Sequence, residues 1–210
     1  MPQRLLIAID GPAGSGKSTV AKTVARRLGL DHLDTGAMYR AVALATLARG
    51  IDAADAAAVA AVAAATHIEV NEVVLVDGVD ESAAVRGPAV TAVVSAVAAV
   101  PAVRAELVRR QRAWAAGRSG GVVEGRDIAS VVFPDAEVKV YLTASDGERA
   151  RRRASEGGDG ADLARRDRLD STRAASPLTV DGGAMVIDTT GLTVEEVVDR
   201  VLAAALAVER

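Results

Sequence analysis

One short motif limits what this chain can fold into more than any other feature. Gly11-Pro-Ala-Gly-Ser-Gly-Lys17-Ser18 matches the pattern G-x-x-x-x-G-K-[ST]. The run Leu5 to Ile9 before it is apolar throughout, as in a strand buried on both faces of a sheet. Ser18 to Leu28 after it carries apolar residues at helical spacing, and Gly29 supplies a helix stop. A strand, a glycine-rich turn and a helix in this order predict a phosphate-binding loop (P-loop) in an α/β fold.

The residues of this loop suit a nucleoside triphosphate. Glycines let successive backbone N–H groups turn towards one point, and the start of the helix adds its positive dipole. Lys17 adds a full charge for the β and γ phosphates, and the Ser18 hydroxyl is the expected ligand of Mg²⁺. We therefore expect Mg²⁺-bound ATP to contact the loop residues Gly11, Pro12, Ala13, Gly14, Ser15, Gly16, Lys17, Ser18 and Thr19.

The rest of the chain alternates between strand and helix patterns. Apolar runs predict strands at Ile68 to Asn71, Val73 to Asp77, Val122 to Glu124, Val138 to Thr143 and Met185 to Asp188. Capping-box spacing predicts helix starts at Ser145 with Glu148 and at Thr193 with Glu196, and Pro101 predicts a third. The alanine-rich stretch Ala53 to Ala65 predicts a further helix. Strands alternating with helices predict a mostly parallel central sheet flanked by helices.

Composition excludes several classes of protein. With 25 Lys and Arg against 28 Asp and Glu, and only one Trp, two Tyr and one Phe, the chain has neither the basic field nor the aromatic platform of a nucleic-acid-binding protein. The absence of cysteine removes disulfides and thiolate metal sites and fits a reducing compartment. The longest uncharged stretch, Gly87 to Val103, contains two prolines and is too short for a membrane span. We expect a cytoplasmic protein that does not bind membranes.

Three further groups of residues carry charge where a ligand could use it. Asp34 to Arg40 places a hydroxyl, an aromatic ring and a guanidinium close together, and Glu124-Gly-Arg126-Asp127 follows a strand at its carboxyl end. Arg149 to Arg153 contains four arginines. Any one of these could lie on a solvated helix face, but together they suit phosphoryl transfer, which needs positive charge on both reacting phosphates. A guanine-reading Asn-Lys-x-Asp motif is absent, which argues against a GTPase switch.

With these motifs the chain resembles bacterial cytidylate kinases, members of the nucleoside monophosphate kinase family. The resemblance extends over essentially the whole chain. It is carried by Ile9-Asp-Gly-Pro-Ala-Gly-Ser-Gly-Lys17, Asp34-Thr-Gly-Ala-Met-Tyr-Arg40, Ser95 with Pro101-Ala-Val-Arg104, Glu124-Gly-Arg-Asp127 with Val132-Phe-Pro-Asp135, and Asp170-Ser-Thr-Arg173 followed by Ser176-Pro-Leu178. It implies transfer of the ATP γ-phosphoryl group to CMP or dCMP. It also implies one P-loop kinase domain, with a core near 1–34, 105–148 and 174–210, a CMP-binding insert near 35–104 and a lid near 149–173.

The resemblance also implies a role for particular residues. Arg40 and Arg126 would bind the CMP phosphate, Ser95, Arg104 and Asp127 would read the cytosine edge, and Arg166, Asp170 and Arg173 would surround the ribose and phosphate. Thr35 and Tyr39 complete the expected CMP site, although Tyr39 could equally pack in the core. The catalytic cations would be Lys17, Arg126, Arg149, Arg153 and Arg166, with the lid arginines reaching the transferring group when the lid closes.

Physical chemistry agrees with the assignment of the base. The cytosine N4 amino group can donate to a carboxylate such as Asp127, whereas uracil would present a carbonyl, and a buried mismatched polar pair costs about 1–3 kcal/mol. No general base is required, because the acceptor is already an anionic phosphate oxygen. We therefore assign no role to His32 or His67.

One segment departs from the family pattern, and two alternatives stay open. The stretch between Arg153 and Arg165 is short and rich in Gly and Asp, so a trimmed lid would predict more ATP hydrolysis in the absence of CMP. The acceptor could instead be UMP, another nucleotide or a small hydroxyl compound such as shikimate. A P-loop protein without an acceptor, acting as a nucleotide-dependent switch, is the other class. We expect a monomer.

Overall fold

The computed structural model describes residues 5–155, except the Arg153 side chain, and residues 180–208. They form two compact units, the first ending at Leu33 and resuming at Ala115, the second spanning Asp34–Trp114. The elements, in chain order, are β1 (Leu5–Asp10), α1 (Lys17–Leu28), β2 (His32–Asp34), α2 (Thr35–Ala48), α3 (Ala56–Ala65), β3 (Ile68–Val70), β4 (Val74–Val76), β5 (Val79–Asp80), η1 (Ala84–Arg86), α4 (Pro88–Ala99), α5 (Pro101–Ala116), β6 (Gly120–Gly125), η2 (Ile128–Val132), β7 (Val138–Thr143), α6 (Asp146–Ser155), β8 (Met185–Asp188) and α8 (Val194–Val208).

A five-stranded sheet forms the centre of the first unit. Its strand order is β2-β6-β1-β7-β8, and β1 pairs in parallel with both β6 and β7, while β7 pairs in parallel with β8. Asp10 at the end of β1 is in register with Gly125 of β6 and Tyr141 of β7. The carboxyl ends of these strands therefore meet at one edge, which is where open α/β sheets bind ligands. The predicted mostly parallel sheet flanked by helices is confirmed.

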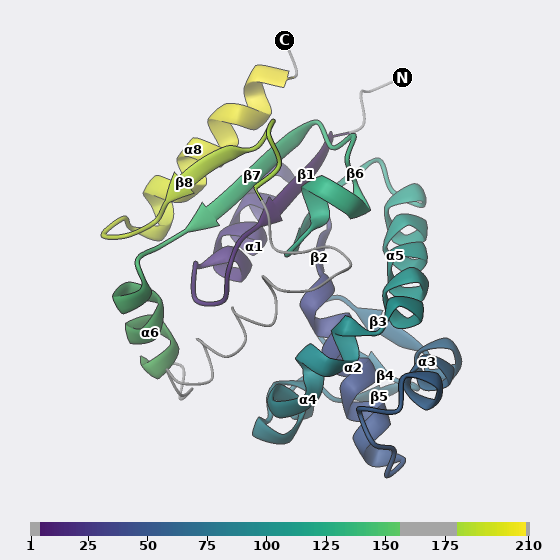
Figure 1. The fold of residues 1–210 in the computed structure, drawn as a ribbon. Coiled ribbons are helices and arrows are strands. Elements are labelled where there is room, and N and C mark those ends of the chain that lie inside the picture. The colour runs from purple at the N-terminus through teal and green to yellow at the C-terminus, as the bar shows by residue number, and fades with distance from the viewer. Residues whose placement is uncertain (1–4, 156–179, 209–210) are drawn as a thin grey trace. The chain divides into compact units, whose positions relative to one another are not determined.

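The core of this unit lies between the sheet and two helices, α1 and α8, which also pack against each other (Figure 1). All six residues of β1 are buried, because neighbouring strands flank it and both of its faces are covered. The main core side chains are Ile7, Ile9, Val20, Val24, Val122, Val140, Leu142, Ile187, Val197, Val198 and Val201. This packing fixes the strand ends from which the functional loops start.

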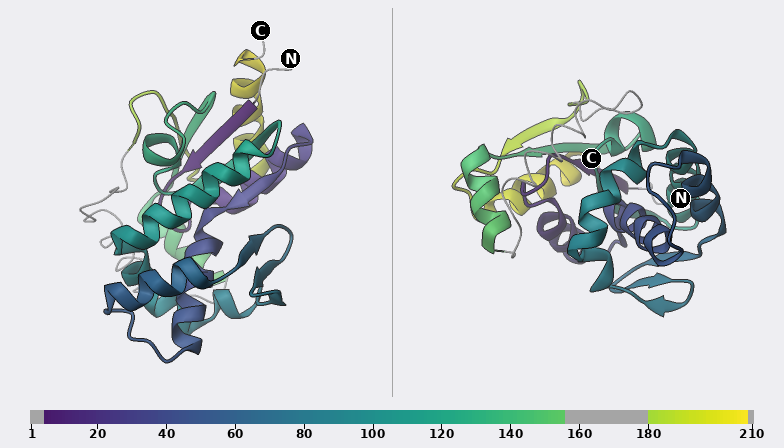
Figure 2. Two further views of the ribbon diagram at one scale, coloured as in Figure 1. Left: turned by 90° about the vertical axis from the view of Figure 1, so that its right-hand side faces the viewer. Right: turned by 60° about the horizontal axis from the view of Figure 1, so that its bottom comes forward.

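The second unit is built around α2, which packs against α3, α4, η1 and a small sheet (Figure 2). That sheet is antiparallel, with the order β3-β4-β5. The strands predicted at Ile68 to Asn71 and Val73 to Asp77 exist, but they pair with each other here instead of joining the parallel sheet. The link between them is too short for a parallel crossover, which needs a dozen or more residues.

Helix ends follow local sequence signals. Thr193 and Glu196 form the predicted reciprocal capping box of α8, in which the Thr193 N–H donates to Glu196 Oε2 at 2.8 Å and the Glu196 N–H donates to Thr193 Oγ1 at 3.3 Å. Ser145 Oγ likewise accepts from the Glu148 N–H at the start of α6, at 3.3 Å. The Glu148 carboxylate instead binds two arginines of its own helix. Both predicted helix starts are confirmed.

The C-terminal end of α3 is capped from a distance by Arg110 of α5. Its guanidinium donates to the backbone oxygens of Thr66, Ala63 and Ala64 at 2.7, 2.8 and 3.2 Å. These carbonyls have no partner within the helix and lie at the negative end of its dipole, so a cation is favoured there.

Among the helices of the described ranges, none is both long and apolar enough to cross a membrane alone. Only α4 and α5 together, bent by 94° at the break between them, meet the length and composition requirements.

Candidate active site

The loop between β1 and α1 is shaped by three glycines with positive φ: Gly11 at +148°, Gly14 at +75° and Gly16 at +89°. Two of them also lie against other backbone. A Cβ at Gly11 would stand 2.0 Å from the Leu142 carbonyl oxygen, and one at Gly14 would stand 2.9 Å from the Arg149 carbonyl oxygen. The motif therefore needs glycine at both positions for close approach as well as for conformation.

Six successive carbonyl groups of this loop, from Gly11 to Gly16, each accept a hydrogen bond. Four of the six donors are cationic side chains. The Gly11 oxygen accepts from Arg126, the Pro12 oxygen from Lys17 Nζ at 2.8 Å, and the Ala13 oxygen from Arg149 at 3.3 Å. The Gly14 oxygen accepts from Arg152 at 3.5 Å, the Ser15 oxygen from Thr189 Oγ1 at 3.2 Å, and the Gly16 oxygen from the Val20 N–H at 3.1 Å. Because the N–H of the next residue points opposite to each carbonyl across a trans peptide, these bonds also fix the loop N–H groups.

A carboxylate at the end of β6 lies beside the start of α1. Ser18 Oγ donates to Glu124 Oε2 at 2.7 Å, and His32 Nε2 lies 3.0 Å from Glu124 Oε1. Glu124 is buried, which by itself raises its pKa. Four interactions together outweigh burial: the hydrogen bond with His32, the charge of Lys17, the charge of His32 and the hydrogen bond from Ser18. The pKa of Glu124 therefore lies below its ordinary value.

A second buried carboxylate, Asp10, connects β1 to the loop after β6. Its two oxygens accept from the N–H groups of Ile128 and Ala129, each at 2.8 Å. Burial raises the pKa of Asp10 to about 6, and the charge of Asp127 adds to that effect, while the two backbone bonds and Lys17 act against it. Asp10 therefore fixes the loop that presents Asp127, which is 5% exposed.

The predicted lid arginines are only partly within the described residues. Arg149 is buried, and besides its bond to Ala13 it donates to Asp146 Oδ1 at 2.5 Å. A role for Arg149 at the transferring phosphoryl group stays a prediction. The Arg153 side chain, Arg166, Asp170 and Arg173 lie outside the described residues, as does most of the expected lid.

The predicted CMP residues of the second unit lie on three of its helices. The Arg104 guanidinium of α5 stands over the Tyr39 ring of α2, 5.7 Å from its centroid, which is a cation–π contact. Arg40 donates to the Val85 oxygen and to Thr91 Oγ1, both at 3.0 Å. Ser95 is buried one helical turn after Thr91 on α4, and Thr35 is buried at the start of α2. The structure thus pairs Tyr39 with Arg104.

Sequence reasoning assigned no site role to five residues that the structure places around the P-loop. They are Asp10, His32, Glu124, Arg152 and Thr189. Asp10, Glu124 and Thr189 share a signal that could have found them, because each stands at or just after the carboxyl end of a predicted strand. His32 and Arg152 have no comparable signal, since their partners are distant in sequence.

The oxygen atoms of Ser18 and Glu124 fit a magnesium ion. Mg²⁺ prefers hard oxygen ligands and commonly takes only one or two from protein, with substrate phosphates and water supplying the rest. Within the part of the chain that the structure describes, no cluster of three or more His, Cys, Asp or Glu side chains could hold a metal ion.

Comparison with known proteins agrees with this geometry. The family model described as cytidylate kinase matches residues 7–206. The chain belongs to the cytidylate kinase family. It is 50% identical over 217 residues to a protein named cytidylate kinase from Geobacillus kaustophilus (strain HTA426), with 96% of each chain covered. It is 49% identical over 214 residues to another from Mycolicibacterium paratuberculosis (strain ATCC BAA-968 / K-10), with 95% of this chain and 94% of the relative covered.

Solved structures support the fold of this cytidylate kinase family member. A gluconokinase from Sinorhizobium meliloti 1021 matches with a TM-score of 0.55 at 15% identity, covering 100% of this chain and 95% of that one. The protein TT1252 from Thermus thermophilus matches with a TM-score of 0.54 at 20% identity, covering 98% and 97%. At these identities the likeness concerns the α/β kinase fold alone.

Proposed function

We propose that this protein transfers the γ-phosphoryl group of ATP to CMP and dCMP, giving ADP with CDP or dCDP. The observation that carries the proposal is the family match over residues 7–206, which includes both the P-loop and the segment Glu124 to Asp127. The P-loop, with Lys17 and Ser18 in place, supports the ATP side of the proposal.

On the ATP side, backbone N–H groups of the loop and the start of α1 bind the phosphates, and Lys17 neutralises charge on the β and γ groups. Ser18 and Glu124 would hold magnesium, which would neutralise part of the negative charge of the ATP phosphates. Lys17 Nζ donates to the Pro12 oxygen at 2.8 Å. When ATP binds, Lys17 would replace this neutral carbonyl acceptor with an anionic phosphate oxygen.

On the CMP side, we propose the residues that the resemblance implies. Arg40 and Arg126 bind the monophosphate, while Ser95, Arg104 and Asp127 read the cytosine edge. The carboxylate of Asp127 accepts from the N4 amino group, and Arg104 donates to the ring acceptors. Thr35, Tyr39, Arg166, Asp170 and Arg173 complete this set of CMP residues.

The transfer needs no general base, because an anionic oxygen of the CMP phosphate attacks the γ-phosphorus directly. The new P–O bond forms as the bond to the β,γ-bridging oxygen of ATP breaks, and ADP leaves with that oxygen. Lys17, Arg126, Arg149, Arg153 and Arg166 supply positive charge around the reacting phosphates. The protein contributes position and electrostatic stabilisation.

We further propose that the enzyme acts in the cytoplasm as a monomer with Mg²⁺-bound ATP as donor. The acceptor side is tested by identifying the product by phosphorus NMR after incubation with Mg²⁺, ATP and CMP. Loss of the ATP γ signal matched by a new CDP β signal supports the proposal. Release of inorganic phosphate in place of CDP contradicts it.

A further inference from the structure

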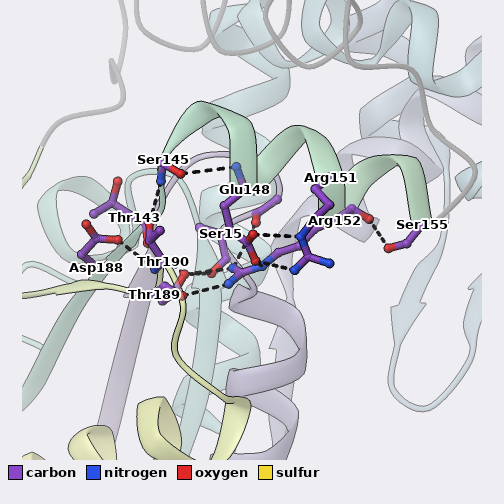
Figure 3. A network of polar contacts seen from close by, with 11 residues as sticks. Ser15, Thr143, Ser145, Glu148, Arg151, Arg152, Ser155, Asp188, Thr189 and Thr190 are labelled. Carbon is purple, nitrogen blue, oxygen red and sulfur yellow. Dashed lines mark hydrogen bonds and ion pairs between the residues drawn. The ribbon is translucent and has the colours of Figure 1, made fainter.

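Two arginines that are neighbours on α6 have different surroundings. Arg151 is 71% exposed and donates to both carboxylate oxygens of Glu148, at 2.9 and 2.7 Å. Arg152 is 23% exposed and reaches the same carboxylate through Nε at 2.8 Å, but its other two nitrogens point to Thr189 (Figure 3). Glu148 therefore forms an ion pair with both arginines, but only Arg152 faces the P-loop.

Thr189 is buried just after β8, where its polar atoms contact Ser15, Thr143 and Arg152. Its N–H donates to the Thr143 oxygen at 2.8 Å. Its Oγ1 accepts from Arg152 at 2.9 Å, and its carbonyl oxygen accepts from the same guanidinium at 2.9 Å. The single hydroxyl hydrogen is then available to the Ser15 oxygen at 3.2 Å or the Thr143 oxygen at 2.9 Å.

These contacts act on two neighbouring peptide groups of the P-loop. Arg152 also lies 3.5 Å from the Gly14 oxygen, and Thr189 binds the Ser15 oxygen. In a trans peptide the C=O and the following N–H point in opposite directions. Fixing the Gly14 carbonyl therefore orients the Ser15 N–H, and fixing the Ser15 carbonyl orients the Gly16 N–H.

We propose that Thr189 and Arg152 are positioning residues for the ATP phosphates. They hold two P-loop carbonyls away from the phosphate so that the N–H groups of Ser15 and Gly16 face it, and Glu148 holds Arg152 in place. The inference rests on the proposed function, which supplies the ATP site. It adds that residues just after β8 and on α6 hold the P-loop of that site in shape. Neither residue has to touch the nucleotide.

The test measures the dissociation constant of Mg²⁺-bound ATP by calorimetry without any acceptor. Thr189→Val removes the hydroxyl at constant shape, and Arg152→Met removes the guanidinium. Each should weaken ATP binding about tenfold, the scale of one or two lost hydrogen bonds. The KM for CMP should stay within about twofold. The double variant should bind ATP about as weakly as the weaker single variant, because both residues act on the same two peptides.

Two matched variants serve as controls. Thr189→Ser keeps the hydroxyl, and Arg151→Met removes the arginine that shares Glu148 without facing the loop; both should bind ATP within about twofold of the unaltered protein. If Thr189→Val does not fold, Arg152→Met against Arg151→Met decides the question.

Normal ATP binding in Thr189→Val and Arg152→Met, with only a lower melting temperature, would overturn the proposal, because the pair would then serve stability alone. An equal rise in the KM for CMP would also overturn it. Failure of the proposed function gives a different result. If the unaltered protein binds ATP but does not phosphorylate CMP, the assignment of CMP as acceptor is wrong. The calorimetric comparison then still decides whether Thr189 and Arg152 position the P-loop.

Discussion

Ser18 and Glu124 are joined by a 2.7 Å hydrogen bond between residues that are 106 positions apart in the chain. The bond connects the first turn of α1 to the end of β6, and His32 lies 3.0 Å from the second carboxylate oxygen. The negative charge of Glu124 is thus fixed next to the hydroxyl that is expected to bind magnesium.

Replacing Glu124 should raise the magnesium requirement. Glu124→Gln keeps the shape but removes the charge, so the Mg²⁺ concentration for half-maximal activity should rise about tenfold. A Mg²⁺ titration of ADP formation at saturating ATP and CMP measures this. Glu69→Gln is a matched control, because Glu69 also lies 3.0 Å from a histidine, but its side chain on β3 is exposed. An unchanged magnesium requirement in Glu124→Gln contradicts the assignment.

Asp127 should determine base selectivity. Asp127→Asn replaces an acceptor for the cytosine N4 amino group with an amide that can rotate to accept or donate, so discrimination between CMP and UMP should fall. The expected change in the ratio of kcat/KM for CMP to that for UMP is about tenfold, from loss of one buried polar match. UMP provides the internal control. An unchanged ratio removes Asp127 from the reading of the base.

The sequence sufficed for those features that are encoded locally. The P-loop, the apolar run of each sheet strand and the two helix starts at Ser145 and Thr193 depend on residues within a few positions of one another. The antiparallel pairing of β3 and β4 was also readable in principle, because the link between them is too short for a parallel crossover.

Contacts between distant residues could not be read in this way. Arg151 and Arg152 are identical in type and adjacent, and only the packing of α6 against the P-loop decides which of them is exposed. His32 stands alone in the sequence, and its partner Glu124 becomes visible only when β2 and β6 come together in the sheet. Such contacts depend on tertiary structure and leave no periodic pattern.

Arg110 should contribute to stability through the carbonyls at the end of α3. Arg110→Met should lower the free energy of unfolding by about 2 kcal/mol, because backbone oxygens lose a charged partner. Arg109→Met is the control, because Arg109 binds the same Glu106 but is 67% exposed, against 19% for Arg110. This substitution should lower the free energy of unfolding by at most about 0.5 kcal/mol. Urea denaturation compares the two. Equal losses would contradict the capping role.

Asp10 should make stability depend on pH. Its folded pKa of about 6 lies above the ordinary 3.8, so the folded state binds the proton more tightly than the unfolded state. The contribution of Asp10 to stability is therefore present below about pH 4 and decreases as pH rises towards 6. Asp10→Asn cannot ionise, and it loses one backbone hydrogen bond at every pH.

The measurement for Asp10 is the free energy of unfolding of both proteins at several pH values. From about pH 4.5 to 7 the Asn variant should gain about 2 kcal/mol relative to the unaltered protein. Parallel curves over this range would mean that burial does not raise the pKa of Asp10.

The choice of acceptor is the most direct test of the whole account. ADP formation is measured in a coupled assay with Mg²⁺ and ATP, adding CMP, dCMP, UMP, AMP or shikimate in separate reactions. We predict rapid turnover with CMP and dCMP and little with the other three. Turnover confined to another acceptor, or ADP formation that no acceptor stimulates, would contradict the assignment of this protein as a cytidylate kinase.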